Sequence, residues 1–473
     1  MLVQFTVSNY LSFNEETTFS MVADGGDQQH PSHLLSDSRP QKNSVLRAAA
    51  IYGANASGKS NFIRAMVFAR DLILNGRRGN QSIPVLPFRL AKANRTRPSS
   101  FEFIFKHKGS TYSYGFRADA SRVMEEWLFA TASVPRSREV QLFERTTDTE
   151  GQAQVSFGPS VYDTDKQKQF LEFVAQGTRR NQLFLTEAFD RNVDAVKPVV
   201  EWFDDVLLLI SAESHHVGLE VRTHANASFT QFIGDFLREA GTGIEEVRVR
   251  EIPVNFDTMF SELPDGLREE IRQATSEAAE PQVLNVNMPN GERWSLERNA
   301  EGIIVRLQLK TIHLTPDGDT VEFALEDESD GTQRLTHLIP ALFFMNEQEQ
   351  VVVVDELDRR LHPLLCRRFV EAALRCGGDA GRSQLIFTTH DTNLLDLDLL
   401  RRDEIWFVEK DAGGASRLYS LAEFNIRPDL KVSKGYLNGR FGAIPFLGDI
   451  CRLGWTEKAE DTEEIRELVE AAE

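Results

Sequence analysis

Residues 51–61 read IYGANASGKSN and contain the strongest signal in the chain. An apolar stretch (46–52) leads into the spacing G-x-x-x-x-G-K-[ST], and a helical pattern follows from Lys59 to Asn75. Glycine lets backbone N–H groups turn inward, and a helix start adds positive charge, so we predict a phosphate-binding loop. The candidate ligand-binding residues are Gly53, Ala54, Asn55, Ala56, Ser57, Gly58, Lys59, Ser60 and Asn61. Lys59 would reach the β- and γ-phosphates of ATP, and Ser60 would ligate Mg²⁺.

A second candidate segment begins with four valines, Val351–Val354, followed by two carboxylates. β-Branched residues favour a central strand, and Asp355 at its end is placed to hold Mg²⁺ through water. Glu356 would then orient or deprotonate an attacking water, as a catalytic base does. The alternative is an ordinary strand that ends in an acidic turn.

Two further segments complete the candidate site. QLIFTTH (384–390) places His390 at the end of the next apolar strand, and parallel neighbours would bring Glu356 and His390 to one sheet edge. A single histidine there is also compatible with a structural role. In ESDGTQRL (328–335), Ser329, Gly331 and Thr332 could open a helix as a second anion site. Ser-Asp-Gly is equally compatible with a plain turn.

Hydrophobic patterns outside these segments suggest the rest of the architecture. Residues 100–160 alternate as strands, residues 165–280 shift towards a helical period, and 282–324 are strand-rich again. Helices are expected at 332–346, 361–376 and 393–400, and strands at EIWFVEK and ASRLYSL. Strands that alternate with helices indicate a parallel α/β sheet. We expect the acidic tail from Glu457 to be a solvated or frayed helix.

Composition excludes several classes of protein. The chain has 473 residues and a formal net charge of −19, so non-specific coating of nucleic acid is disfavoured, although a local basic groove is compatible with it. Three cysteines form neither a disulfide framework nor a zinc pattern, which favours a reducing cytoplasm. We see no signal peptide and no membrane span. His215, His216 and His224 lack the spacing of a metal site, and Arg359-Arg360 could meet phosphate, a partner or nucleic acid.

The order of these motifs resembles that of ABC and SMC-type ATPases. MLVQFTVSNYLSF, GANASGKSN, ESDGTQRL, DELDRRLHP, FTTHDTNLLD and YLNGRFGAIP look like the AAA-annotated, ABC-like ATPases of bacterial phage-defence and abortive-infection modules. The resemblance covers about Met1–Ala120 and Glu322–Pro445 and implies an α/β ABC-type head with a β-rich insertion and a helical subdomain. We assign residues 1–120 and 282–446 to its two halves, 121–160 to the β-rich insertion, 161–281 to the helical insertion and 447–473 to the acidic tail.

The resemblance also implies functions for individual residues. In a head-to-head dimer, residues 53–60 of one subunit and 329–332 of the other would enclose ATP and Mg²⁺. Asp355 and Glu356 correspond to the Walker B acid and catalytic glutamate, His390 to the switch histidine, and Asp358 falls near the D-loop. Gln182 is a candidate Q-loop residue. The signature reads SDGTQ in place of SGGQ, and neither a long coiled coil nor a fused nuclease is visible.

Three functional hypotheses remain open at this stage. The first is an ATPase that acts as the sensor or switch of an antiviral defence system, controlling a nuclease or toxin encoded nearby. The second is a scaffold that holds nucleotide with negligible turnover. The third is a DNA-repair ATPase that grips DNA ends, which the acidic charge disfavours.

Overall fold

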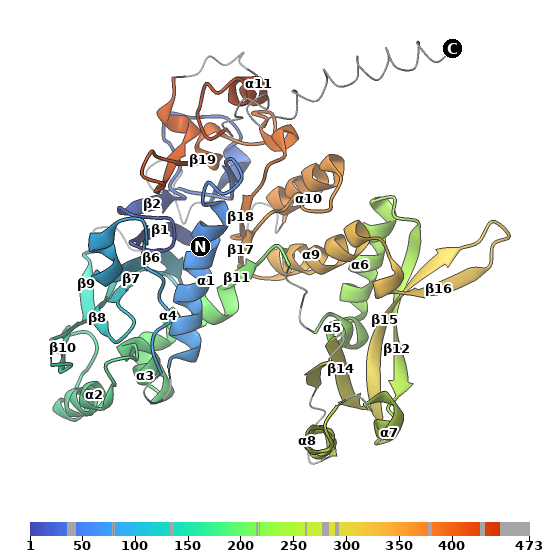
Figure 1. Ribbon diagram of the computed structural model, residues 1–473, viewed down its shortest axis with the longest axis horizontal. Helices are drawn as coiled ribbons and strands as arrows, with labels where there is room; N and C mark the ends of the chain where they lie inside the picture. Colours follow the sequence, from blue (N-terminus) through green and yellow to red (C-terminus); the bar gives the residue numbers. More distant parts are fainter. Residues whose placement is uncertain are drawn as a thin grey trace, which may run out of the picture.

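The structure is a computed structural model of the chain (Figure 1), and it contains three large sheets and one two-stranded sheet. The residues that it describes are 1–35, 44–77, 79, 81–132, 137–148, 150–213, 216, 218–260, 263–276, 283–288, 293–376, 381–425 and 431–444. The predicted acidic tail (447–473) lies outside them.

The central element is a six-stranded sheet. Its strands, in spatial order, are β11 (Leu207–Ile210), β17 (Val351–Val354), β18 (Gln384–Thr388), β5 (Ala48–Tyr52), β19 (Ile405–Lys410) and β20 (Ser416–Ser420). The first five strands run parallel, and β20 pairs antiparallel with β19. Every residue of β5, β17 and β18 is buried, as expected of a parallel sheet covered on both faces. The predicted parallel α/β sheet is therefore confirmed.

Helices cover both faces of this sheet. Val351 and Val353 belong to a core that includes α1 (Lys59–Asn75), while Val352 and Val354 belong to a second core. That second core contains side chains of α9 (Asp330–Glu347), α10 (Pro363–Arg375) and α11 (Val432–Leu437). Alternate side chains of one strand thus point into different cores, because successive residues of a strand face opposite sides.

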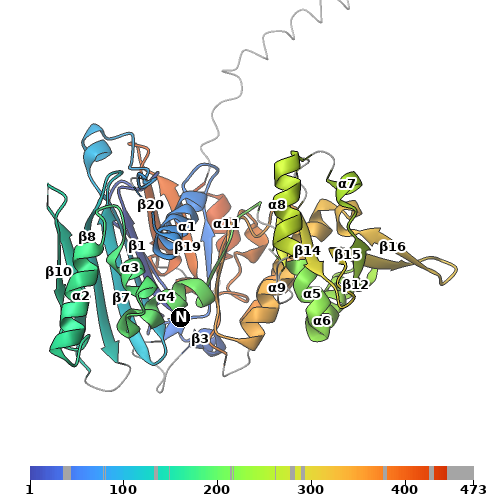
Figure 2. The ribbon, with the colours of Figure 1, turned by 90° about the horizontal axis from the view of Figure 1, so that it is seen from below.

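A seven-stranded antiparallel sheet packs on the α1 side. Its order is β10 (Ala153–Phe157), β9 (Val140–Thr147), β8 (Val123–Ala132), β7 (Ser110–Ala118), β6 (Ser99–His107), β1 (Leu2–Ser8) and β2 (Thr17–Ser20). Three helices accompany it, α2 (Asp165–Gly177), α3 (Phe184–Asp190) and α4 (Lys197–Glu201), which lie beside it in Figure 2. The predicted boundary at residue 120 is wrong as a division, because β7 and β8 pair across it in this one sheet.

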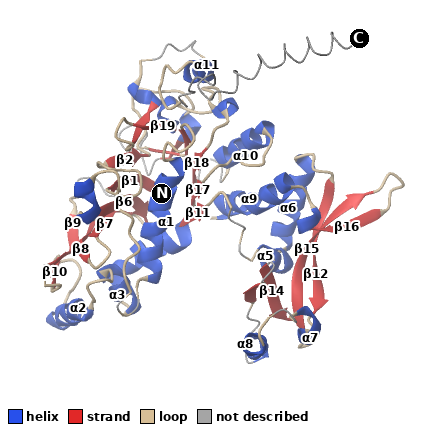
Figure 3. Cartoon of the chain, viewed as in Figure 1, coloured by secondary structure: helices blue, strands red, loops and turns tan. Residues whose placement is uncertain are grey.

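A second lobe surrounds the third sheet. It contains β12 (Ile244–Pro253), β13 (Leu284–Asn287), β14 (Arg293–Arg298), β15 (Ile304–Leu314) and β16 (Thr320–Ala324), with α5 (Leu219–Ala225), α6 (Ala227–Glu239), α7 (Phe256–Met259) and α8 (Asp265–Ser276). Figure 3 shows these strands and helices together, to one side of the main lobe. The prediction of a wholly helical 161–281 is wrong, because β12 pairs along β15 and β11 joins the central sheet.

The shorter elements include one further correction. Strands β3 (Leu34–Leu35) and β4 (Val45–Leu46) form a pair, and a π-helical turn spans Trp202–Val206. Single 3₁₀ turns cover Pro31–His33, Lys92–Thr96, Asp194–Val196, Leu325–Asp327, Thr392–Leu394, Arg402–Glu404 and Leu421–Glu423. The helix expected at 393–400 is only the turn Thr392–Leu394, since Asp391 and Asp396 accept hydrogen bonds from nearby backbone amides, an alternative to helix.

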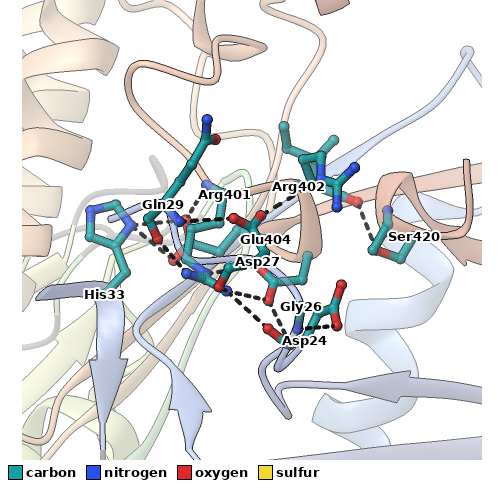
Figure 4. A network of polar contacts seen from close by, with 12 residues as sticks. Asp24, Gly26, Asp27, Gln29, His33, Arg401, Arg402, Glu404 and Ser420 are labelled. Carbon is teal, nitrogen blue, oxygen red and sulfur yellow. Dashed lines mark hydrogen bonds and ion pairs between the residues drawn. The ribbon is translucent and has the colours of Figure 1, made fainter. Parts of the chain in front are cut away.

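A buried polar network closes the amino-terminal edge of the central sheet (Figure 4). Arg401, fully buried, forms an ion pair with Asp403 and donates hydrogen bonds to backbone carbonyls of residues 24–29. Glu404 accepts from the backbone N–H of Arg401 and lies 3.0 Å from a ring nitrogen of His33. These contacts tie the N-terminal loop to the start of β19, so the opposite, carboxyl-terminal edge of the sheet remains available for a site.

Among the described residues, no helix combines the length and the apolar character needed to cross a bilayer.

Candidate functional site

The predicted phosphate loop lies between β5 and α1, and tight packing explains its glycines. A Cβ on Gly53 would come within 2.4 Å of the Val408 carbonyl oxygen. Gly58 has φ of 119°, and a Cβ there would lie 2.2 Å from Ser416 Oγ. A side chain at either position would displace the turn, so both glycines are required by the local geometry.

Backbone amides at the start of α1 face a position where an anion would fit. In the described structure, the N–H groups of Gly58, Lys59, Ser60 and Asn61 donate to no protein acceptor. A helix N-terminus with unused N–H groups attracts anions. The hydroxyl of Ser57 is buried and also has no partner. The Asn61 side chain instead donates to Ser12 Oγ at 2.9 Å, so it braces the loop.

Lys59 lies at the centre of the site. Its Nζ donates to the carbonyl of Gly53 at 2.8 Å and lies 2.9 Å from His390 Nε2. Burial lowers the pKa of Lys59 to about 8, although the carboxylates of Asp355 and Glu356 oppose that shift. Among the described residues the ammonium forms no ion pair, which leaves it available to an incoming phosphate.

The acidic end of β17 meets the loop. Asp355 Oδ1 accepts a hydrogen bond from Ser60 Oγ at 3.2 Å and another from Thr388 Oγ1 at 2.7 Å. The Glu356 backbone N–H donates to the same Thr388 hydroxyl at 2.7 Å. Glu356 has φ of 49°, an unusual conformation for a residue with a side chain. Thr388 thus holds both acidic residues, and sequence reasoning missed it, although TTH at the end of β18 placed it there.

His390 follows β18, the parallel neighbour of β17. Its ring is near Lys59, and its backbone N–H donates to Asp358 Oδ2 at 3.2 Å. Partial desolvation and then the charge of Lys59 lower the pKa of His390. A neutral ring can accept a hydrogen bond at Nε2 from the Lys59 ammonium, and we assign the tautomer of His390 from this contact. Asp358 Oδ1 is buried and without a partner, so this carboxylate can accept a further donor.

The predicted signature residues begin α9. Ser329 is its N-cap and accepts a hydrogen bond from the Thr332 backbone N–H at 3.2 Å. A Cβ on Gly331 would come within 2.7 Å of the Arg360 carbonyl, and Arg360 pairs with Asp330 at 3.5 Å. In the described structure none of Ser329, Gly331 and Thr332 forms a hydrogen bond with residues 53–61 of its own chain.

Two arginines lie beside the acidic pair, and sequence reasoning missed the first of them. Arg334 is buried on α9 and donates to the carbonyl of Asp355 at 3.3 Å and to that of Ser211 at 3.3 Å. Burial lowers the pKa of Arg334. Arg359 lies 3.6 Å from Glu356 and 3.2 Å from Glu213. These arginine contacts orient the backbone and side chains beside the acidic pair.

The structure therefore brings together Lys59, Ser60, Asp355 and His390, which come from three segments of the chain. Gln182 is not among them: it lies between α2 and α3, where its carbonyl accepts a hydrogen bond from Arg145. No group of three or more potential metal ligands occurs among the described histidines, cysteines and carboxylates.

The site fits a nucleoside triphosphate and Mg²⁺ on the evidence of its own atoms. The free N–H groups and the unpartnered Ser57 hydroxyl can form a cradle for phosphate oxygens, in a turn that has no room for a Cβ at residue 53 or 58. The Ser60 hydroxyl faces the Asp355 carboxylate, and such oxygen ligands suit Mg²⁺.

Several solved structures and one protein family are similar to this chain. Solved structures similar to the chain include the SMC head domain from Thermotoga maritima, at 13% identity and a TM-score of 0.35, covering 90% of this chain and 99% of that one. Another is the Smc head domain with an extended coiled coil bound to the C-terminal domain of ScpA, derived from Pyrococcus furiosus. It matches at 13% identity and a TM-score of 0.34, covering 89% of this chain and 96% of that one.

A third solved structure, the SmcHead bound to the C-winged helix domain of ScpA, matches at 12% identity and a TM-score of 0.36, covering 89% of this chain and 97% of that one. A comparison with curated proteins gives no match. The family described as "AAA domain, putative AbiEii toxin, Type IV TA system" matches residues 48–396, well over half of the chain and all of the site described above. The chain belongs to this family of AAA domains.

Proposed function

We propose that the chain is an ATPase that binds ATP and Mg²⁺ at the phosphate loop and hydrolyses ATP at the carboxyl-terminal edge of the central sheet. The observation that carries the proposal is the convergence of Lys59, Asp355 and His390 from segments as much as 331 residues apart. Membership of an AAA family supports it. Such convergence around unused N–H groups is what phosphoryl transfer requires.

Each residue has a defined part in the proposed reaction. The N–H groups of Gly58–Asn61 and the ammonium of Lys59 bind phosphate oxygens, and Ser60 and Asp355 hold Mg²⁺, which when bound supplies positive charge against the phosphates. Glu356 orients a water and takes its proton while the water oxygen bonds to the γ-phosphorus. The bond from that phosphorus to the bridging oxygen breaks, leaving ADP and phosphate. His390 is placed to contact the γ-phosphate.

A Lys59→Ala variant tests nucleotide binding. We expect its affinity for ATP to fall at least about thirtyfold, because a charge-assisted contact with phosphate is removed from a buried position. Titration calorimetry with ATP and Mg²⁺ measures this effect. Arg64→Ala, an exposed residue on the same helix, is the control and should bind as the native chain does. Equal ATP affinity in Lys59→Ala and the native chain would contradict the proposal.

The proposal extends to a homodimer in which Ser329–Thr332 of one subunit covers the nucleotide of the other. The N-terminus of α9 is exposed at Ser329 and makes no hydrogen bond to its own phosphate loop, which is compatible with a contact in trans. ATP can favour the closed dimer only through contacts that it makes in that state. Closure and reopening would then act as a switch for a separate effector, a nuclease or toxin, in antiviral defence.

A mixing experiment tests the clamp. Ser329→Arg and Lys59→Ala should each lose ATPase activity, since each damages both sites of its own homodimer. A mixed dimer keeps one intact site, so an equal mixture should regain about a quarter of native activity if subunits exchange freely. Steady-state phosphate release at a fixed total protein concentration measures the gain. No recovery, with exchange verified by differently tagged subunits, would contradict the shared site.

If nucleotide binds tightly and phosphate release stays at background in the native dimer, the scaffold hypothesis replaces the ATPase.

A further inference from the structure

A cavity of about 690 Å³ lies in the main lobe, away from the phosphate loop. It is enclosed by the segment after α1, the β7–β8 turn, the β9–β10 turn and the end of α2, at the side of the molecule where Figure 1 labels β8, β10 and α2. Its lining residues are Gly79, Gln81, Ser82, Ala120, Ser121, Gly151, Gln152, Ala153, Ala175, Gln176, Thr178, Arg179, Arg180 and Asn181. Helix α1 has 17 residues, so its two ends are about 25 Å apart and the two sites are distinct.

The lining carries positive charge in a chain that is otherwise acidic. Its described lining residues include two arginines and no aspartate or glutamate, although the whole chain has a formal net charge of −19. Within the described structure, the guanidinium groups of Arg179 and Arg180 form neither a hydrogen bond nor an ion pair. Among the described residues, several other exposed arginines, such as Arg64 and Arg138, also form no ion pair, whereas Arg117 is paired with Glu125. The two free cations are therefore available to an anion.

Buried groups hold the arginine pair in position. Arg145, fully buried, donates to the carbonyl oxygens of Arg179 and Gln182. The Val123 backbone N–H donates to the carbonyl of Arg180 at 2.7 Å, which joins the segment to β8. On the facing wall, Asn181 donates to the carbonyls of residues 79 and 81. These hydrogen bonds hold the backbone at residues 79, 81, 179 and 180 in place before any ligand arrives, which lowers the entropic cost of binding.

The glycine of the β9–β10 turn lies beside one of the arginines. Gly151 has φ of 86°, and a Cβ there would lie 3.4 Å from Arg180 Cδ. The helix dipole places about −0.5 elementary charge at the C-terminus of α2, beside the cavity. This negative charge is smaller in magnitude than the two positive charges of the arginines. The cavity therefore keeps a net positive field.

We propose that this cavity binds a small organic phosphate. Its volume falls in the range of small-molecule sites, about 300–1,000 Å³, and guanidinium groups match phosphate oxygens in pairs. The free hydroxyl of Ser82 and the free amides of Gln152 and Gln176 can meet the hydroxyl groups of a sugar or similar body. A nucleic acid is the less favoured ligand, because the lining has no aromatic ring on which bases would stack and the chain is acidic.

The test uses the full chain and three named probes: ribose 5-phosphate, AMP and glycerol 3-phosphate. We expect saturable binding of at least one probe by calorimetry at 150 mM NaCl. Arg179→Ala/Arg180→Ala should weaken that binding at least about tenfold, through the loss of charge-assisted contacts. Arg138→Ala is the matched control, an exposed arginine near the opposite end of β9. Both changes are on the surface, so unchanged melting temperatures will show that the variants are folded.

The remaining arms separate the alternatives. Lys59→Ala should retain the binding, because that residue belongs to the phosphate loop; loss of binding there, with retention in the double variant, would assign the probe to the phosphate loop and overturn the proposal. Failure of all three probes to bind in an arginine-dependent way would also overturn it. So would arginine-dependent binding of a twelve-nucleotide single-stranded RNA with no binding of the three small phosphates.

Discussion

Glu356→Gln should reduce the turnover number for ATP about 100-fold or more while leaving ATP binding close to native. A positioned general base contributes about 10²–10⁴ to a rate, and glutamine keeps the size of the side chain without its proton affinity. The Glu356 carboxylate is partly exposed to solvent, and it is not one of the groups that we expect to bind the phosphates. Single-turnover phosphate release and ATP titration, measured on the same preparation, separate the two effects.

Glu347 provides a matched control, because it precedes β17 whereas Glu356 follows that strand. Glu347 is an exposed carboxylate at the end of α9, a few residues before β17. Glu347→Gln makes the same chemical change in charge and size, and it should leave turnover at the native level. If Glu356→Gln kept native turnover, or if both variants slowed turnover equally, Glu356 would not be the base.

Two kinds of sequence pattern predicted parts of the candidate site: a local motif and the order of the strands. The spacing of Gly53, Gly58 and Lys59 marks the loop without knowledge of the rest of the fold. The prediction that Glu356 and His390 lie at one sheet edge followed from parallel neighbouring strands, and β17 and β18 are such neighbours. Thr388 and Arg334 were missed because their roles depend on which backbone and side-chain atoms face them across the fold.

Non-local pairing also explains the errors in the fold. IEEVRVREIP (244–253) has charged residues on both sides of its apolar positions, and its partner β15 begins more than fifty residues later, so no local pattern distinguishes it from its helical surroundings. The predicted division at residue 120 falls in a turn between paired strands. Turn residues occur both between strands of one sheet and between domains. The turn near residue 120 was therefore mistaken for a domain boundary.

Glu126 forms a buried ion pair with Arg145 inside the seven-stranded sheet. Its carboxylate also accepts hydrogen bonds that join this sheet to α3. Its carboxylate accepts from the backbone N–H groups of Phe184 at 2.7 Å and Leu185 at 2.9 Å, and it lies 3.6 Å from Arg145 with both side chains fully buried. Burial raises the pKa of Glu126 and lowers the pKa of Arg145. Each charge is therefore costly without the other.

Glu126→Gln should lower the free energy of unfolding by about 3–5 kcal/mol, because Arg145 keeps its buried charge and loses its counter-ion. Glu125→Gln is the control one residue away: it removes an exposed pair with Arg117, and such pairs contribute about 0–1 kcal/mol. Urea unfolding of both variants measures the difference. The arginine pair of the cavity is attached to Arg145 through the carbonyl of Arg179, so Glu126→Gln should also loosen that wall and weaken probe binding there. Equal stability of the two variants would show that the buried pair does not hold this part of the sheet, and the fixed cavity wall would then need another cause.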